Sequence, residues 1–302
     1  MNDAKSHISV CICTYRRPDW LRRLLLSLQE QQTDGLFSYS IVVADNDAAE
    51  SARDLVTEIS GVSAVPVVYC IEPQKNIALV RNKAVDTATG NWIAFIDDDE
   101  FPIKEWLLNL YQACTTQKAQ GALGAVRPHF DEMPPAWIKK CGLYDRPEHK
   151  TGFVMSWGES RTGNVLFRRE ILSSTGPAFS PRFPNGGEDQ DFFRRMGERG
   201  HRFVWCNEAV VYETVPPIRW NKMVMIRRAM LRGRNTLKHA RGVTWGKSIV
   251  TSIVAVPAYT LLLPFLALVG RHLFMRYLIR LFDHLGRLLA AVGLNRVRER
   301  VG

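Results

Sequence analysis

Short apolar runs and segments of helical periodicity alternate along the first hundred residues. The apolar runs are β-branched and hydrophobic on both faces, as in buried strands of a parallel sheet, and they lie at residues 8–13, 40–44, 65–71 and 92–96. Apolar residues at helical spacing predict a helix after each of the first three runs, at residues 19–28, 48–59 and 76–89. This order predicts an α/β fold with a mostly parallel sheet and right-handed crossovers.

Polar side chains stand where three of these four strands end. Thr14 follows the first strand, Asp45 follows the second, and the acidic run 97–100 follows the fourth. Ligands of such sheets bind beyond the carboxyl ends of the strands, so we expect a nucleotide site at this edge. The chain has no Gly-x-Gly-x-x-Gly and no Gly-Lys-Ser/Thr sequence, which argues against a dinucleotide-binding fold and a P-loop.

The acidic run Asp97-Asp98-Asp99-Glu100 places four carboxylates directly after a buried strand. Such crowding is costly unless a cation is bound, and hard oxygen ligands suit Mg²⁺ or Mn²⁺ held together with substrate phosphates. The alternative is a solvated turn in which one aspartate caps a helix that begins near Ile103. The triplet after a buried strand favours metal and phosphate binding.

Composition narrows the class of protein. With 302 residues, 46% hydrophobic and 23% charged, the chain is typical of globular proteins and not of disordered or collagenous ones. Its six cysteines form no Cys-x-x-Cys pair, which argues against a zinc site or a disulfide framework and suits a reducing cytosolic compartment.

Charge and hydropathy set the last third of the chain apart. Residues 217–302 contain 16 Lys and Arg but two acids, whereas the first 216 residues have a net charge of 24 − 28 = −4. Residues 248–270 carry no charge and are long enough to cross a bilayer, although Pro257 and Pro264 interrupt them. Both flanks are positive, which favours a re-entrant or interfacial hairpin, followed by a basic amphipathic helix at 273–292 on anionic lipid.

Two other interpretations of this region remain, a buried helical subdomain and a nucleic-acid-binding surface. Nucleic-acid binding predicts basic and aromatic residues interleaved with polar ones, which a 23-residue uncharged run does not provide. We therefore expect membrane association and no nucleic-acid partner.

Six motifs in order resemble the family 2 glycosyltransferases, over about residues 8–215. On the donor side the chain has Cys-Ile-Cys-Thr-Tyr-Arg-Arg, Val-Ala-Asp-Asn-Asp, Asn76 with Arg81-Asn82, and Ile-Asp-Asp-Asp-Glu. The segments Thr-Gly-Asn-Val-Leu-Phe-Arg at 162–168 and Gly-Glu-Asp-Gln-Asp-Phe-Phe-Arg at 187–194 resemble the acceptor-side motifs. The resemblance implies a GT-A (Rossmann-like) fold, and within the family it is closest to bacterial exopolysaccharide glucosyltransferases of the succinoglycan type.

The resemblance implies donor-site roles for the residues at the strand ends. Thr14, Tyr15 and Asp45 would hold the uracil and ribose of a UDP-sugar, with Arg17 near the phosphates. The other residues expected at the sugar-nucleotide are Asp47, Asn76, Arg81, Asn82, Asp97 and Asp98. Asp99, with Asp97, would bind the metal, although Asp98 could substitute for either. If the strand geometry persists, alternation would send Asp97 and Asp99 to the same side. The alternative is that Thr14 simply ends a strand, that Asp45 caps a helix and that Arg81 is an ordinary surface residue.

The acceptor-side motifs imply the catalytic base of an inverting transfer. Asp189 would take the proton of the acceptor hydroxyl, while Glu188 and Asp191 would orient the acceptor or the loop. The alternative is a helix start rich in acids that match the helix dipole. The residues expected at the acceptor are Gly163, Asn164 and Arg228. Many relatives have a metal-binding histidine where this chain has Glu213.

These expectations combine into one hypothesis. Residues 1–216 would form the glycosyltransferase domain, with a donor half to about 120 and an acceptor half after it, and residues 217–302 a basic, apolar, helical membrane-association region. The enzyme would move a hexose, by preference glucose, from a UDP-sugar to a polyprenyl-diphosphate-linked glycan. It would work at the cytoplasmic face of the bacterial inner membrane, in exopolysaccharide or surface glycan synthesis. The rival hypotheses are a nucleotidyltransferase and a non-catalytic membrane scaffold.

Overall fold

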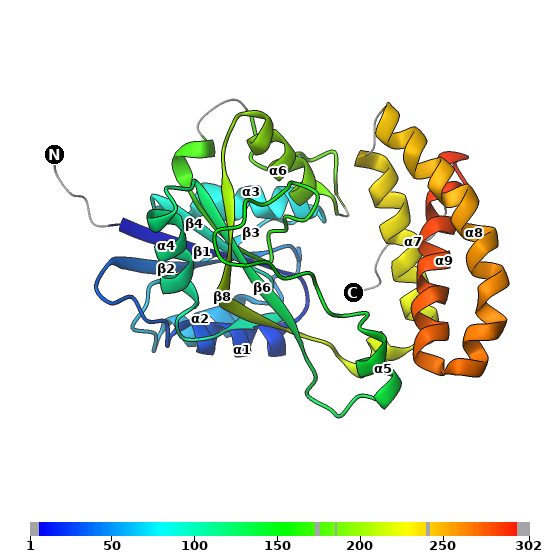
Figure 1. The fold of residues 1–302 in the computed structure, drawn as a ribbon. Coiled ribbons are helices and arrows are strands. Elements are labelled where there is room, and N and C mark those ends of the chain that lie inside the picture. The colour runs from blue at the N-terminus through cyan, green and yellow to red at the C-terminus, as the bar shows by residue number, and fades with distance from the viewer. Residues whose placement is uncertain (1–5, 173–175, 185, 240–241, 295–302) are drawn as a thin grey trace. The chain divides into compact units, whose positions relative to one another are not determined.

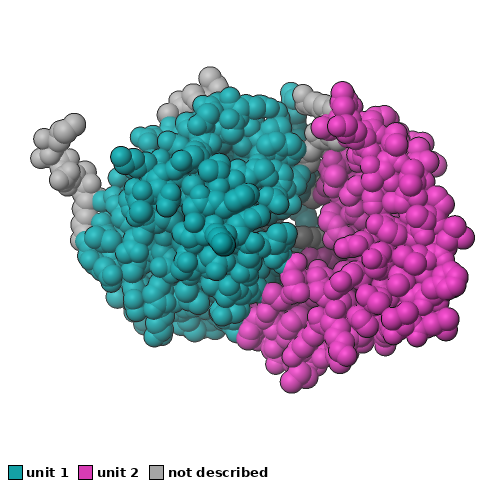
Figure 2. All heavy atoms as spheres, in the orientation of Figure 1, with its two compact units in different colours: residues 1–127, 146–213, 302 teal, residues 128–145, 214–301 magenta. Residues whose placement is uncertain are grey.

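The computed structural model describes residues 6–172, 176–184, 186–239 and 242–294. The chain divides into two compact units (Figure 2). The first contains the residues up to 127 together with 146–213, and the second contains 128–145 and 214–301. Residues 128–145, which the sequence analysis places in the first domain, therefore belong to the second unit.

One mixed sheet of eight strands organises the first unit. The strands lie in the order β3 (Val67–Ile71), β2 (Phe37–Asp45), β1 (Ser6–Thr14), β4 (Trp92–Ile96), β7 (Asn164–Arg168), β6 (Gly121–His129), β8 (Phe203–Thr214) and β5 (Glu100–Pro102). β3, β2, β1 and β4 are parallel, as their hydrophobic pattern predicts. β7 is antiparallel to β4 and β6, and β5 is antiparallel to β8, so the predicted acceptor half adds antiparallel strands.

Helices cover both faces of this sheet (Figure 1). Alternate residues of β1 point to opposite faces, so Ile8, Val10 and Ile12 join one apolar cluster while Cys11 joins the other. The first cluster includes residues of α1 (Pro18–Leu28), α2 (Arg53–Ser60) and α4 (Trp106–Thr116). The second includes residues of α3 (Ile77–Thr87) and α6 (Glu188–Glu198), and the 3₁₀ turn Arg169–Leu172 lies beside it.

The register of the parallel strands brings the predicted site residues to one edge. Thr14 pairs with Asp45 at the ends of β1 and β2, and β4 ends at Ile96, directly before the acidic run. Ile96 pairs with Asn164, so the acceptor-side motif begins next to the same strand end.

The second unit is helical. Its elements are α5 (Ala136–Cys141), the 3₁₀ turn Pro217–Trp220, α7 (Lys222–His239), α8 (Val243–Val269) and α9 (Arg271–Ala291). α9 packs against both α7 and α8, and also against α5, around an apolar cluster of its own (Figure 1). Among the described residues, α8 is the one helix long and apolar enough to cross a membrane by length and composition.

Asn164 joins the antiparallel strands to helix α4 from inside the sheet. Its Oδ1 accepts a hydrogen bond from Trp106 Nε1 at 2.8 Å. Its Nδ2 donates to the carbonyl oxygens of Ala125 at 3.0 Å and Ala209 at 2.8 Å. All three bonds are buried, so Asn164 is a structural connection among β7, β6, β8 and α4, and its predicted contact with an acceptor remains untested.

Replacing this amide should destabilise the fold. Asn164→Leu removes the partner of the buried Trp106 N–H and one hydrogen bond to each of two buried carbonyl oxygens, which should lower the free energy of unfolding by about 2–4 kcal/mol. Urea denaturation measures this change. Asn109→Ala, which removes one exposed bond to the Glu208 carbonyl, is the control and should cost about 0.5 kcal/mol. Equal losses in the two variants would contradict this role of Asn164.

Candidate active site

The acidic run forms a tight turn and does not continue strand β4. The Glu100 N–H donates to the Asp97 carbonyl oxygen at 3.1 Å, and the Asp97 N–H donates to Glu100 Oε2 at 3.2 Å. The strand geometry on which the expected alternation of Asp97 and Asp99 depends does not persist, because the extended backbone ends at Ile96.

Residues at the end of β1 and directly after it contact the second and third aspartates. Thr14 Oγ1 donates to Asp98 Oδ2 at 2.9 Å, and Arg17 Nη1 donates to Asp98 Oδ1 at 2.9 Å. The same Arg17 nitrogen lies 3.6 Å from Asp99 Oδ2. Burial raises the pKa of Asp98 to about 6, although Arg17 acts in the opposite direction. Arg17, which was expected near the phosphates, thus forms one cluster with Asp98, expected at the sugar-nucleotide, and Asp99, expected at the metal.

Arg81 connects the acidic turn to the acceptor-side motif. Its Nη2 lies 3.4 Å from Asp97 Oδ1, and its Nη1 forms an ion pair with Glu188. The Arg81 side chain is 8% exposed, so Arg81 is a buried member of the site and not a surface residue. The structure therefore brings together Asp97 and Glu188, which are far apart in the sequence and come from opposite halves of the predicted domain.

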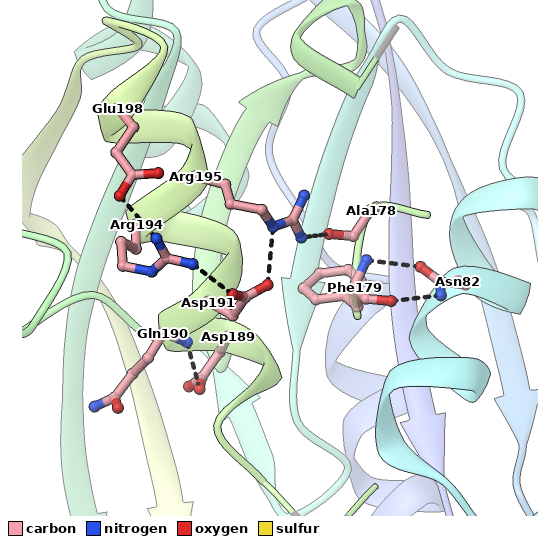
Figure 3. Close-up of polar contacts among 9 residues, drawn as sticks. All are labelled: Asn82, Ala178, Phe179, Asp189, Gln190, Asp191, Arg194, Arg195 and Glu198. Carbon is pink, nitrogen blue, oxygen red and sulfur yellow. Dashed lines mark hydrogen bonds and ion pairs between the residues drawn. The ribbon is translucent and has the colours of Figure 1, made fainter. Parts of the chain in front are cut away.

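The acidic motif 188–191 opens helix α6. Gly186 and Gly187 precede it with φ of +110° and +102°, a backbone conformation that favours glycine. Glu188 is buried, and burial raises its pKa to about 7 against the effect of Arg81. Asp189 is partly exposed, and its Oδ1 accepts a hydrogen bond from the Gln190 N–H at 2.7 Å (Figure 3).

Asp191 is engaged by its own helix. It accepts hydrogen bonds from Arg194 at 2.9 Å and Arg195 at 2.8 Å, and Arg195 also donates to the Ala178 carbonyl oxygen (Figure 3). Burial disfavours the charged form of Asp191, but the two arginines outweigh burial and lower its pKa. Asp191 was expected to orient either the acceptor or the loop. These contacts support the second role, in which Asp191 holds the loop that contains Ala178.

Asn76 and Asn82 also hold that loop. Asn76 caps α3, where its Oδ1 accepts from the Ala78 N–H at 2.9 Å, and its Nδ2 donates to the Pro181 carbonyl oxygen at 3.2 Å. The Asn82 side-chain amide forms two hydrogen bonds of 2.8 Å with the backbone of Phe179 (Figure 3). Their predicted contacts with the sugar-nucleotide remain untested.

Asp45 and Asp47 build the loop after β2. Asp45 is fully buried, and its carboxylate accepts hydrogen bonds from the Asp47 N–H at 2.9 Å, the Ala52 N–H at 2.8 Å and the Tyr69 hydroxyl at 3.1 Å. Hydrogen bonds from Arg16 lower the pKa of Asp47. These contacts support the alternative that Asp45 has a structural role, and a contact with uracil remains a prediction.

Tyr15 is partly buried, and its ring lies under a cation from another loop. Lys75 Nζ is 4.3 Å from the centre of the Tyr15 ring. Its contact with the nucleotide remains a prediction.

Glu100 and Arg146 are site residues that the sequence analysis did not identify. Burial raises the pKa of Glu100 well above its ordinary range, and Glu100 Oε1 has no hydrogen-bond partner in the described part of the chain. A Cβ at Gly163 would lie 2.9 Å from that atom and 3.0 Å from Asp97 Oδ2, so glycine allows this close approach. Arg146 forms an ion pair with Glu213, which pairs with Glu100 across β5 and β8. Position 100 in the acidic run was a visible signal, whereas Arg146 lies in an irregular segment without a motif.

The donor atoms of this turn fit a hard divalent cation. Asp97 is the most exposed of the three aspartates, with 45% of its side chain accessible, and Asp99 lies nearby on the same turn. In the described residues no group of three His, Cys, Asp or Glu side chains is arranged to hold a metal ion. One or two carboxylates together with ligand phosphates are the usual environment of Mg²⁺, so these residues suit Mg²⁺ or Mn²⁺ brought by a phosphate ligand.

Two further features lie outside this cluster. Arg228 is exposed on α7 of the second unit, and its contact with an acceptor remains a prediction. A cavity of about 640 Å³ lies at the start of β4, lined by Trp92, Arg168 and Asn82 among others, and none of the carboxylates above lines it. We therefore assign the chemistry to the charged cluster and not to this cavity.

Comparison with known proteins decides the family. The model of glycosyl transferase family 2 matches residues 9–175. The chain belongs to this family. It is 32% identical over 303 residues to the succinoglycan biosynthesis protein ExoM of Rhizobium meliloti strain 1021, with 97% of this chain and 95% of that protein covered. The Escherichia coli chondroitin synthase is 23% identical over 71% of this chain, which spans 36% of that protein.

Solved structures show the same fold. The crystal structure of residues 1–349 of S. aureus TarS in complex with UDP has a TM-score of 0.53 and 16% identity, covering 97% of this chain and 92% of that one. This family 2 glycosyltransferase therefore has the α/β fold that its motifs predict.

The raised pKa of Glu188 should affect stability in a defined pH range. Its pKa lies above the ordinary 4.5, at about 7, so the folded enzyme binds more protons than the unfolded chain between these values, and stability falls as pH rises. Glu188→Gln removes this titration, so the stability of the variant relative to the wild type should improve as the pH rises through this range. Urea denaturation at several pH values measures the difference.

The control for this prediction is Glu198→Gln on the same helix. Its carboxylate is 60% exposed and pairs with Arg194. This variant should show no comparable pH-dependent gain. If the difference in the free energy of unfolding between Glu188→Gln and the wild type stayed constant over this pH range, the folded state would not raise the pKa of Glu188.

Proposed function

We propose that this glycosyltransferase moves a hexose, by preference glucose, from a UDP-sugar to a polyprenyl-diphosphate-linked glycan in exopolysaccharide or surface glycan synthesis. The observation that carries the proposal is the buried Arg81, which contacts Asp97 of the donor motif and Glu188 of the acceptor motif. The relationship to a succinoglycan biosynthesis protein supports the product class, and the UDP complex of TarS supports the donor class.

Among the three acids of the acceptor motif, Asp189 is best placed to be the base. Glu188 is buried against Arg81, and Asp191 accepts from Arg194 and Arg195. Asp189 is partly exposed, and its Oδ1 accepts a hydrogen bond from the adjacent Gln190 N–H. Asp189 therefore has accessible carboxylate lone pairs for an acceptor hydroxyl, and it would take that proton as the oxygen bonds to the anomeric carbon.

On the donor side, Arg17 and the acidic turn would position the diphosphate. Arg17 lies against Asp98 and Asp99, where its guanidinium can also meet a phosphate oxygen. A divalent cation held by Asp99 and Asp97 would stabilise the negative charge of the departing UDP. Arg81 contacts Asp97 and Glu188, so the same side chain would position both the donor-side turn and the residue directly before the base.

Because the chain belongs to a glycosyltransferase family, the hypothesis that it is a nucleotidyltransferase is excluded. The enzyme would bind anionic lipid at the cytoplasmic face of the bacterial inner membrane, where it would meet its lipid-linked acceptor. The apolar α8 and the excess of basic residues after position 216 support this location.

Removing the base should abolish transfer without affecting the fold. Asp189→Ala should lower the rate of sugar transfer by roughly 10²–10⁴-fold, because proton abstraction in the transition state is lost. UDP release from a panel of UDP-sugars, with a lipid-linked acceptor, measures the rate. Gln190→Ala, one residue along the same helix, should retain most activity. A scaffold protein would tolerate both substitutions equally.

Removing divalent cations with a chelator tests whether the acidic turn binds a metal ion that transfer requires. Transfer should fall to background with EDTA and return with Mn²⁺ or Mg²⁺, because Arg17 and Arg81 already pair with the carboxylates of the turn, so a divalent cation would be needed to balance the departing diphosphate. Asp99→Asn should need a higher Mn²⁺ concentration for half-maximal activity, whereas Asp86→Asn, outside the turn, should not. Rates that are unchanged by EDTA would contradict the predicted metal role.

A further inference from the structure

Helix α8 of the second unit has one packed face and one exposed apolar face. Ser252 is fully buried, and Val256, Tyr259 and Leu263 pack against the cluster of this unit at helical spacing. The opposite face exposes large apolar side chains over most of the helix, at Val250, Ile253, Val254, Leu261, Phe265 and Leu268. At 1.5 Å per residue the 27-residue helix is about 40 Å long, so this face is an extended apolar stripe.

Two contacts fix how α9 lies along α8. Ser252 Oγ is 3.0 Å from His284 Nδ1, and the rings of Tyr259 and Tyr277 are centred 5.5 Å apart. Tyr259 comes seven residues after Ser252 on α8, whereas its partner Tyr277 comes seven residues before His284 on α9. The two helices are therefore antiparallel. This register places the middle of α8 beside residues 276–280 of α9.

The register argues against a membrane-spanning α8. If α8 crossed a bilayer, Arg276 and Arg280 would lie near its midplane, where charged side chains are strongly disfavoured. Arg276 donates to the Cys141 carbonyl oxygen at 2.7 Å, and Asp283 pairs with Arg232 of α7 at 2.8 Å. Because these contacts join α9 to α5 and α7, a membrane-spanning α8 would also bring α5 and α7 into the hydrocarbon core of the bilayer.

We propose that α8 lies in the plane of the membrane surface, with its exposed face among the acyl chains and anionic headgroups around its ends. Lys247 and Arg271, both exposed, flank the apolar stripe, and Trp245 is 41% exposed near the first of them. The excess of basic residues in this part of the chain complements anionic lipid. This inference rests on the proposed membrane association and defines its geometry.

Flotation with lipid vesicles tests the surface. The full chain should float with vesicles of phosphatidylcholine and phosphatidylglycerol, and less with phosphatidylcholine alone. Leu261→Glu with Phe265→Glu should reduce the bound fraction about tenfold. Val62→Glu with Met133→Glu, at positions 87% and 82% exposed, is the control of equal charge and should float like the wild type. Equal flotation of the two double variants would overturn the proposal.

Cysteine labelling tests the orientation. Lys247→Cys and Arg271→Cys should both react with a membrane-impermeant maleimide in inverted inner-membrane vesicles, and neither should react in spheroplasts. The unsubstituted chain, with its six free cysteines, gives the background. Reaction of the two sites from opposite sides would show a spanning helix and overturn the proposal.

Two readouts separate this inference from the proposed function. UDP release should be unchanged in the Leu261→Glu, Phe265→Glu variant with a soluble acceptor, so loss of flotation with retained chemistry supports the surface. A dimer in sedimentation that this variant dissociates, with no vesicle binding by the wild type, would assign the face to a second copy and overturn the proposal.

Discussion

A buried guanidinium between two carboxylates holds the active site together. Arg81 is 8% exposed, and such a charge is stable in a protein interior only when it is paired. Its partners come from different elements, the turn after β4 and the start of α6. Any displacement of α6 from α3 would leave a buried charge without its partner, which is costly. The geometry of the acceptor motif is therefore set by the donor motif.

The same edge concentrates acids beyond what its arginines balance. Burial raises the pKa of Asp98, Glu100 and Glu188, so each carboxylate is less favourable in its charged form here than in water. A fold selected for stability alone would place apolar residues at such positions. A divalent cation and a diphosphate would make this charge distribution favourable, because the cation offsets the acids and the arginines meet the phosphates.

The sequence predicts the parts of the site that follow from strand geometry. Thr14, Asp45 and the acidic run lie at one edge because parallel strands align their carboxyl ends. The pairing of Arg81 with Glu188 was not predictable from periodicity, because it depends on how α3 and α6 pack on the same face of the sheet. Arg146 gave no signal, since it lies in an irregular segment. The alternation of Asp97 and Asp99 was expected only if the strand continued, and the strand ends at Ile96.

The predicted polar contacts near the loop 176–184 show a second limit of motif reasoning. Asn76 and Asn82 occupy motif positions, yet their amides hold the backbone of Pro181 and Phe179. A motif residue can thus serve a site by fixing a loop. Hydropathy has the same limit in α8, because an uncharged helix suggests a membrane span until the register of its neighbour is known. Arg276 and Arg280 belong to α9, so no window over α8 contains them, and the packing of two helices decides what the composition of one leaves open.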